Sequence, residues 1–433
     1  MRLATANLFD ASIANLQRRQ NALQQQQQQL TSGKRVAMAS DDPTGAARAE
    51  RALVSIGRVE ANQRALEASR NSMTLAESAL GDANELLQQA RETMVAAGNA
   101  SYSDAERAGL ATKLKGLRDQ LLSIANRPDG AGGYLFSGQG ASTPPFLDQP
   151  AGVSYIGVPG TIQTGNLDDF QLTVDGRNVW EEAGSGNGSF VTAPSVIISD
   201  PATGKTSVQL IDPGATAANG GVPVALVNPI TSKPASGWID SGRVVDPARL
   251  TGHNYRIDIA GTAPSQTYTL TDQDAGTAVS GTFEPGKAIT ADGMSFTISG
   301  APIDGDAFAI AGSKTNLKLF DTLDKAIVDL NTPLRTRNQV TQGNALAVRD
   351  IDAVMGKLQS ARSQVGERLN NLDGTEGRLA ALKQYSEQER SAAEDLDMVQ
   401  GISDFQNQQT GYDTALKTYA MVQRMSLFQY LQG

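Results

Sequence analysis

The chain has 433 residues, a formal net charge of −9, no cysteine and a single histidine, His253. These counts exclude a disulfide framework, a thiolate metal site, a cysteine nucleophile and any site that needs two histidines. No apolar run approaches the roughly 18–20 residues of a membrane span, and the N-terminus lacks the apolar stretch of a conventional signal peptide. We therefore expect no membrane partner.

The charge is distributed unevenly along the chain. Residues 134–315 hold 8 Lys and Arg against 17 Asp and Glu, so they account for the net charge, and the two flanks together are neutral. A nucleic-acid-binding protein needs a basic patch. The acidic middle therefore predicts no nucleic-acid partner.

The first 133 residues predict mainly helix. Phe9, Leu16, Leu23 and Leu30 lie seven residues apart, which indicates a helix with one narrow apolar seam. In the next helix, large and small residues alternate on the seam, so that a partner helix can approach closely. The large residues are Leu66, Met73, Leu80, Leu87 and Met94, and the small ones are Ser69, Ala76, Ala83, Ala90 and Ala97. A third helix is predicted to begin with Asp104 as its cap.

From residue 134 to 315 the pattern changes to short alternating runs that glycine and other turn residues separate. The runs include FQLTVDG, SVIIS, YRIDIAG, QTYTLTD, MSFTISG and DAFAIAG. They predict a β-rich domain, sandwich or barrel-like, that holds both tryptophans, Trp180 and Trp238.

Helical periodicity returns at Asn316 in three successive stripes. The first comprises Phe320, Leu323, Ile327, Leu330 and Leu334. The second comprises Ile351, Val354, Leu358, Ala361, Val365, Leu372, Leu379, Leu382 and Leu396. The last comprises Met398, Ile402, Phe405, Tyr412, Leu416 and Tyr419, with Gln409 on the same seven-residue frame.

The order helix, β, helix predicts an α+β fold, in which both chain ends form a long antiparallel helical rod with the β-rich domain inserted between them. We expect terminal assembly helices at 1–40 and 398–433, the rod at 41–133 and 316–397, and an outer β-rich domain at 134–315. Isolated helices with such thin seams are marginal, so the terminal helices are expected to be stable when packed on other copies. The predicted assembly residues are Phe9, Leu16, Leu23, Leu30, Ile402, Phe405, Tyr412, Leu416, Tyr419, Leu427 and Phe428.

The segment between the first two helices, LTSGKRVAMASDDPTG (30–45), contains a Gly-Lys pair and two adjacent aspartates. The Gly33–Lys34 pair lacks the leading glycine and the Ser/Thr of a phosphate-binding loop, and Asp41 and Asp42 have no third ligand nearby. A helix joint explains the segment better: Gly33 ends one helix, Asp42 caps the next, Pro43 takes its first position, and Asp41 lies near its positive end.

The sequence contains no catalytic, cofactor or metal constellation that we could identify. His253 stands alone before a predicted strand, and the acidic loop EEAGSGNGS (181–189) lacks the ligand spacing of a calcium loop. We therefore expect no enzyme activity, no cofactor and no metal. An alternative is a carbohydrate-binding or hydrolytic β domain, which the two tryptophans and several acidic residues would serve.

Four segments together resemble bacterial flagellins and their hook-associated relatives. They are LTSGKRVAMASDDPTGAARA (30–49), LRDQLLSIANRPDGAGGYLFSGQGASTPPF (117–146), VGERLNNLD (365–373) and GYDTALKTYAMVQRMSLFQYL (411–431). They lie on both helical flanks in the family's order and leave the β region uncovered. The DDP of the joint, the GGYLFSG run, the start MRLAT and the ending SLFQYLQG are more similar to hook-associated members than to filament-forming flagellins.

The resemblance implies a structural subunit of the bacterial flagellum at the junction between hook and filament, with a flagellin-like filament subunit as the alternative. The implied partners are copies of itself in a ring, the preceding hook-associated protein on the hook side, flagellin on the filament side, and an export chaperone on the C-terminal helix. The resemblance also implies an extracellular location reached through the flagellar type III apparatus.

Overall fold

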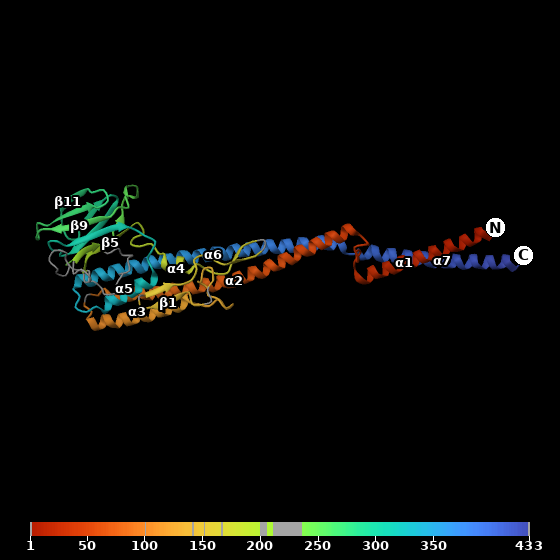
Figure 1. Ribbon diagram of the computed structural model, residues 1–433, viewed down its shortest axis with the longest axis horizontal. Coiled ribbons are helices and arrows are strands. Elements are labelled where there is room, and N and C mark those ends of the chain that lie inside the picture. The colour runs from red at the N-terminus through yellow and green to blue at the C-terminus, as the bar shows by residue number, and fades with distance from the viewer. Residues whose placement is uncertain are drawn as a thin grey trace. The chain divides into compact units, whose positions relative to one another are not determined.

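Long helices form where the apolar seams run without interruption. The computed structural model describes residues 2–99, 101–140, 143–150, 152–165, 168–199, 206–210 and 236–431. Its long helices are α1 (Arg2–Ser32), α2 (Pro43–Ala97), α3 (Asp104–Ala125), α5 (Leu319–Asn331), α6 (Arg337–Glu394) and α7 (Met398–Leu431). All strands of the described residues lie between α3 and α5, so the expected α+β order is confirmed (Figure 1).

The chain divides into two compact units, to both of which α2 and α6 contribute. The terminal unit comprises residues 1–65, 165–167 and 373–433, and the central unit comprises residues 66–164 and 168–372. Among the described residues, no helix has the length and apolarity that crossing a membrane requires.

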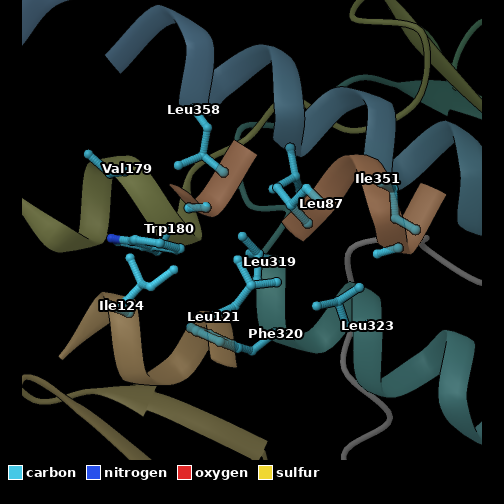
Figure 2. Packing of buried hydrophobic residues seen from close by; sticks show 14 of the residues in the cluster. Leu87, Leu121, Ile124, Val179, Trp180, Leu319, Phe320, Leu323, Ile351 and Leu358 are labelled. Atoms are coloured by element: carbon cyan, nitrogen blue, oxygen red, sulfur yellow. The ribbon is translucent and has the colours of Figure 1, made fainter. Parts of the chain in front are cut away.

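The helical core of the central unit is built on the seam of α2. All ten seam residues predicted between Leu66 and Ala97 are at most 2% exposed, so this prediction is confirmed. Leucines of three other helices pack into the same core: Leu121 of α3, Leu323 of α5 and Leu358 of α6 (Figure 2). Alternating large and small residues let these helices approach α2 closely.

The cap of helix α3 lies one residue earlier than predicted, and the helix itself begins at Asp104. Ser103 is the N-cap: its hydroxyl accepts from the amide of Glu106, and the Glu106 carboxylate accepts from the amide of Ser103 at 2.7 Å. This reciprocal pair satisfies two free amides at once, which a lone aspartate cap does not. The prediction of Asp104 as the cap was wrong, and its carboxylate pairs with Arg107 one turn on.

Three leucines predicted on the seams of the returning helices lie elsewhere. Leu334 is 91% exposed, because α5 ends at Asn331 before a proline that disfavours further helix. Leu382 is 39% exposed, because the buried line runs through Leu379 and Ser386 and leaves it to one side. Leu396 follows the end of α6.

The first part of the glycine-rich region packs on the central helices. It comprises β1 (Phe146–Gln149), β2 (Gly152–Tyr155), β3 (Gln163–Thr164), β4 (Phe170–Gln171) and α4 (Gly176–Glu181). Trp180 of α4 is 1% exposed; its ring meets Phe136 edge-on at 5.4 Å and stacks on Phe320 of α5 at 6.1 Å between centroids. These aromatic contacts join this part of the chain to the helical core (Figure 2).

The second part forms a separate β module within residues 190–312. Its strands are β5 (Phe190–Ser199), β6 (Thr206–Leu210), β7 (Gly237–Ile239), β8 (Arg243–Val244), β9 (Tyr255–Ala260), β10 (Thr267–Asp272), β11 (Ala278–Thr282), β12 (Ala288–Ala291), β13 (Met294–Gly300) and β14 (Ala307–Gly312), with a short 3₁₀ helix at Pro247–Arg249. One antiparallel sheet has the order β11-β10-β9-β14-β5-β6; the other has the order β12-β13-β7, with β8 also on β13.

Alternate residues of the β module face a core of its own. In β9, Tyr255, Ile257 and Ile259 are buried and the residues between them are partly exposed. Phe296 of β13, from the smaller sheet, joins the same cluster. Two sheets therefore share one apolar core, as in the sandwich that the period-two runs predict.

A short backbone ladder, which we call the neck, connects the β module to the helices. The amide of Ala183 donates to the carbonyl of Leu317 at 3.1 Å, and the reverse bond measures 3.0 Å. The amide of Ser185 donates to the carbonyl of Lys314 at 2.8 Å. The outgoing and returning chains thus leave the helical part side by side.

Candidate assembly site on the terminal helices

In the terminal unit, α1 and α7 lie side by side and run antiparallel (Figure 1). Two glycines of α7 fix the register: a Cβ at Gly401 would lie 3.2 Å from Leu30 Cδ2, and one at Gly411 would lie 2.6 Å from Arg19 Nη1. A side chain at Gly401 would press on Leu30, whereas the neighbour at Gly411 is the flexible end of Arg19, so these close approaches mark which residues of the two helices face each other. Residue 30 thus lies beside residue 401, and residue 19 lies beside residue 411. Because the numbering falls along α1 as it rises along α7, the two helices are antiparallel.

The predicted assembly residues divide into two faces. Leu16, Leu23 and Leu30 of α1 and Phe405, Tyr412 and Tyr419 of α7 are half-buried. In contrast, Ile402 is 46% exposed and Leu416 is 41% exposed. A pair of helices buries one narrow line on each partner, so the second line of α7 faces outward. The side chains of Phe9, Leu427 and Phe428 lie outside the described residues.

The structure adds exposed apolar residues that the sequence analysis missed. In the terminal unit they include Ile13 at 41%, Met38 at 61%, Tyr385 at 60%, Val399 at 82% and Met421 at 59% exposure. Glutamine at 409, on the frame of Ile402 and Leu416, was a usable signal that this line of α7 is not an internal seam. No comparable signal identifies Met38 or Val399, which lie in or beside breaks between helices.

The joint between α1 and α2 is built from glycine and carboxylate caps. Gly33 follows the last residue of α1 with φ of 70°, the left-handed conformation that ends many helices. Asp42 Oδ1 accepts from the amides of Thr44 at 3.1 Å and Gly45 at 2.9 Å, and Pro43 begins α2. The bond from Gly45, followed by the Thr44 hydroxyl, lowers the pKa of Asp42 to about 2.

The neighbouring aspartate has a different part in the joint. Asp41 Oδ2 accepts from the amides of Ala37 at 3.1 Å and Met38 at 2.9 Å. It therefore closes the turn that precedes α2. Both carboxylates of the Asp-Asp pair are thus occupied by backbone amides.

The joint is bonded to a second break, between α6 and α7. The carbonyl of Glu394 accepts from the amide of Arg35 at 2.8 Å, and the Lys34 ammonium lies 3.3 Å from the Glu394 carboxylate. The amide of Leu396 donates to the carbonyl of Gly33 at 2.9 Å. These bonds hold the two breaks together and engage Lys34 in an ion pair.

His253 and the two tryptophans were the candidates for a histidine site or for carbohydrate binding, and the structure shows what surrounds each of them. Nδ1 of His253 lies 2.8 Å from Oδ2 of Asp272, whose hydrogen bond raises the histidine pKa. Trp180 lies in the helical core, while Trp238 is partly exposed on β7. In the part of the chain that the structure describes, no group of three His, Asp or Glu side chains could hold a metal ion.

Known protein families match both helical flanks. The N-terminal helical region of bacterial flagellin matches residues 5–141, and its C-terminal helical region matches residues 348–431. The chain belongs to the bacterial flagellin family. In this flagellin-family chain, the joint lies within the N-terminal match and α7 lies within the C-terminal match.

Individual relatives of this flagellin-family chain are hook-associated proteins. It is 36% identical over 154 residues to flagellar hook-associated protein 3 of Salmonella typhimurium, which is 35% of this chain and 48% of that protein. The chain thus spans about half the length of this curated relative.

Two solved structures of Legionella pneumophila proteins share the fold. The crystal structure of its flagellar hook-associated protein 3 has a TM-score of 0.65 and 25% identity, and the match covers 78% of this chain and 97% of that one. The crystal structure of its flagellar junction protein has a TM-score of 0.60 and 26% identity, over 74% of this chain and 97% of that one.

Proposed function

We propose that this chain is a structural subunit of the bacterial flagellum that forms the junction between hook and filament. It assembles through packing of its N- and C-terminal helices against neighbouring copies. The similarity to hook-associated protein 3 and to a flagellar junction protein supports this place in the flagellum.

The observation that carries the proposal is the outward apolar line of α7. Ile402 and Leu416 lie two seven-residue repeats apart on α7, so they fall on one line of the helix. Both are large aliphatic side chains, yet each is more than 40% exposed. Exposed apolar side chains that recur on one helical line indicate a surface for another helix. Burial against a neighbouring copy supplies the stability that the thin α1–α7 seam lacks.

The remaining parts of the proposal concern the surroundings of the subunit. Copies of the chain form a ring; a preceding hook-associated protein contacts its hook side and flagellin its filament side. A flagellar export chaperone binds the C-terminal helix before export through the type III apparatus to the cell exterior. The proposal assigns no catalytic step to the chain.

Deleting residues 398–433 tests the proposal at its strongest point. We expect the truncated protein to keep the melting transition of its central unit, because the core of that unit contains no residue of α7. We also expect it to be absent from hook tips in complemented cells, which would bear hooks without filaments. Normal filament attachment by the truncated protein would refute the proposal.

A point variant tests the exposed line without removing a helix. We expect Ile402→Ser with Leu416→Ser to reduce incorporation at hook tips while the circular dichroism of the purified protein stays unchanged. The matched control is Val279→Ser, an aliphatic residue on β11 that is 60% exposed and far along the chain from α7. Equal effects of the two changes on incorporation would argue against a role of the exposed line of α7 in assembly.

Seeded growth distinguishes the junction from the filament. Purified protein is added to filament fragments and the length of new polymer is measured by electron microscopy. A junction subunit is expected to add no long polymer, whereas a flagellin-like subunit would extend the fragments.

A further inference from the structure

Strand β7 is the edge of the sheet β12-β13-β7, and its backbone groups point alternately to two sides. On the side of β13, the amide of Asp240 donates to the carbonyl of Thr297 at 3.0 Å, and the amide of Ala301 donates to the carbonyl of Ser236 at 3.1 Å. The amide and carbonyl of Ile239 therefore face away from β13, where an edge strand has no further strand to pair with.

A side chain of α6 occupies the place of that missing strand. Gln342 is 1% exposed; its Oε1 accepts from the amide of Ile239 at 2.8 Å, and its Nε2 donates to the carbonyl of Ile239 at 3.2 Å. A carboxamide carries one acceptor and one donor, as a backbone peptide group does. The helix thus completes the hydrogen bonding of the sheet edge through one residue.

Two more side chains of α6 bind the backbone of the β module. Nδ2 of Asn338 donates to the carbonyl of Ser236, and Nη1 of Arg349 donates to the carbonyl of Thr192 in β5 at 3.0 Å. The Arg349 side chain is 6% exposed, and its charge is balanced by Asp350, whose Oδ1 accepts from Nε at 2.9 Å.

The three residues lie on one face of α6, because their spacings of four and seven residues return to the same side of a helix. From 338 to 349 they span about 16 Å along the helix axis at 1.5 Å per residue. They bind backbone atoms of both sheets of the β module, β7 in the smaller and β5 in the larger.

We propose that Asn338, Gln342 and Arg349 are positioning residues that hold the β module at a single orientation on α6. The neck joins the β module to the helices at one end of the module. By itself, this single connection would let the module rotate relative to α6. Attachments spread along the helix and to both sheets remove that rotation. The same contacts cover the edge of β7, which would otherwise be open to pairing with another chain.

The absence of cysteine lets the proposal be tested on the full-length protein. Spin labels at Lys113→Cys on α3 and Val279→Cys on β11, both exposed, report the distance between the helices and the β module by pulsed electron paramagnetic resonance. Gln342→Leu keeps the size of the side chain and removes its hydrogen bonds. We expect it to broaden the distance distribution.

Amide hydrogen exchange gives a second readout at the edge itself. In Gln342→Leu, the amide of Ile239 is expected to lose about tenfold or more of its protection, because the bond to Oε1 is gone. The amide of Asp240, which donates to Thr297, is expected to keep its protection. Thr341→Ala, one residue away in α6, is the matched control, since its hydroxyl bonds within the helix to the carbonyl of Arg337.

The outcomes separate the proposal from a general loss of stability. Broadening in Gln342→Leu but not in Thr341→Ala supports it. If Gln342→Leu does not fold, Asn338→Ala replaces it, with a smaller broadening expected. An unchanged distance distribution in a folded variant, or equal broadening in Thr341→Ala, overturns it, because the side-chain contacts of α6 would then not restrain the module.

Discussion

The part of helix α2 in the central unit and helix α7 in the terminal unit have apolar residues at the same seven-residue spacing, yet they bury them to different extents. The α2 seam from Leu66 to Ala97 is at most 2% exposed, whereas Leu416 of α7 is 41% exposed. Residues of α3, α5 and α6 pack into the core around α2, and α7 packs against α1 in the part that the structure describes. The spacing determines the stripe, and the number of covering helices determines the burial.

This difference has an energetic consequence. Fully burying a leucine or methionine stabilises a fold by roughly 1.5–3 kcal/mol, so the buried α2 seam contributes strongly to the stability of the central unit. A half-exposed line contributes a fraction of that. The terminal unit is therefore expected to gain stability from assembly, while the central unit is not.

The largest expected effect is in the central core. Trp180→Ala should lower the free energy of unfolding of the central unit by about 3–5 kcal/mol, because it leaves a cavity between Phe136 and Phe320. Leu16→Ala in half-buried α1 should cost about 1 kcal/mol or less. Denaturant unfolding of the two variants measures both, and similar losses would contradict the contrast between the units.

A smaller effect is expected from the polar contacts that join elements of the central unit. Arg118 of α3 binds Asp148 through Nη1 and Nη2 at 2.6 and 2.7 Å and binds Asp324 of α5 through Nε at 2.8 Å. The bidentate bond to Asp148 raises the pKa of the guanidinium. Arg118→Met should cost about 1–3 kcal/mol, because it leaves two partly covered carboxylates unpaired.

Arg127→Met is the matched control for this ion-pair network. Arg127 contacts Asp82 at 2.8 Å, with both side chains about a third or more exposed, so its removal should cost about 0–1 kcal/mol. Equal losses of stability on thermal unfolding of the two methionine variants would show that the Arg118 network is no stronger than a surface pair.

The smallest expected effect is local and depends on pH. The pKa of Asp42 is lowered from 3.8 to about 2 by the amides and hydroxyl that it accepts from. Its stabilisation of the α2 start is therefore present above about pH 4 and is lost as the pH falls through about 2. The amide of Gly45 should exchange faster over this range. Asn is an equally good cap that does not titrate, so Asp42→Asn should abolish the pH dependence.

Much of the helical part could be predicted from particular residues. Glycine at 33, aspartate at 42 and proline at 43 each have a local preference that places a helix end or start, and the structure has α1 and α2 ending and starting there. Seam residues of α2 were predicted because alternating large and small side chains leave one face to bury. The cap of α3 was missed because Ser103 and Asp104 are both good caps, and only the Glu106 side chain decides between them.

Other features could not be read from local patterns. Leu382 and Ile402 fit their frames as well as the buried residues do, and only the arrangement of neighbouring helices leaves them exposed. Trp180 lies in a glycine-rich stretch that predicts β structure, but its ring stacks on Phe320, 140 residues further along the chain. Such contacts depend on how distant segments meet.

The sequence by itself determined the helical flanks, the β-rich middle, the joint and the family resemblance, because each rests on neighbouring residues and their spacing. The tertiary structure alone decided which seam residues are covered, which part of the middle joins the helical core, and how α6 holds the edge of β7. Those features depend on residues more than one hundred positions apart, such as Ile239 and Gln342, whose pairing no local preference specifies.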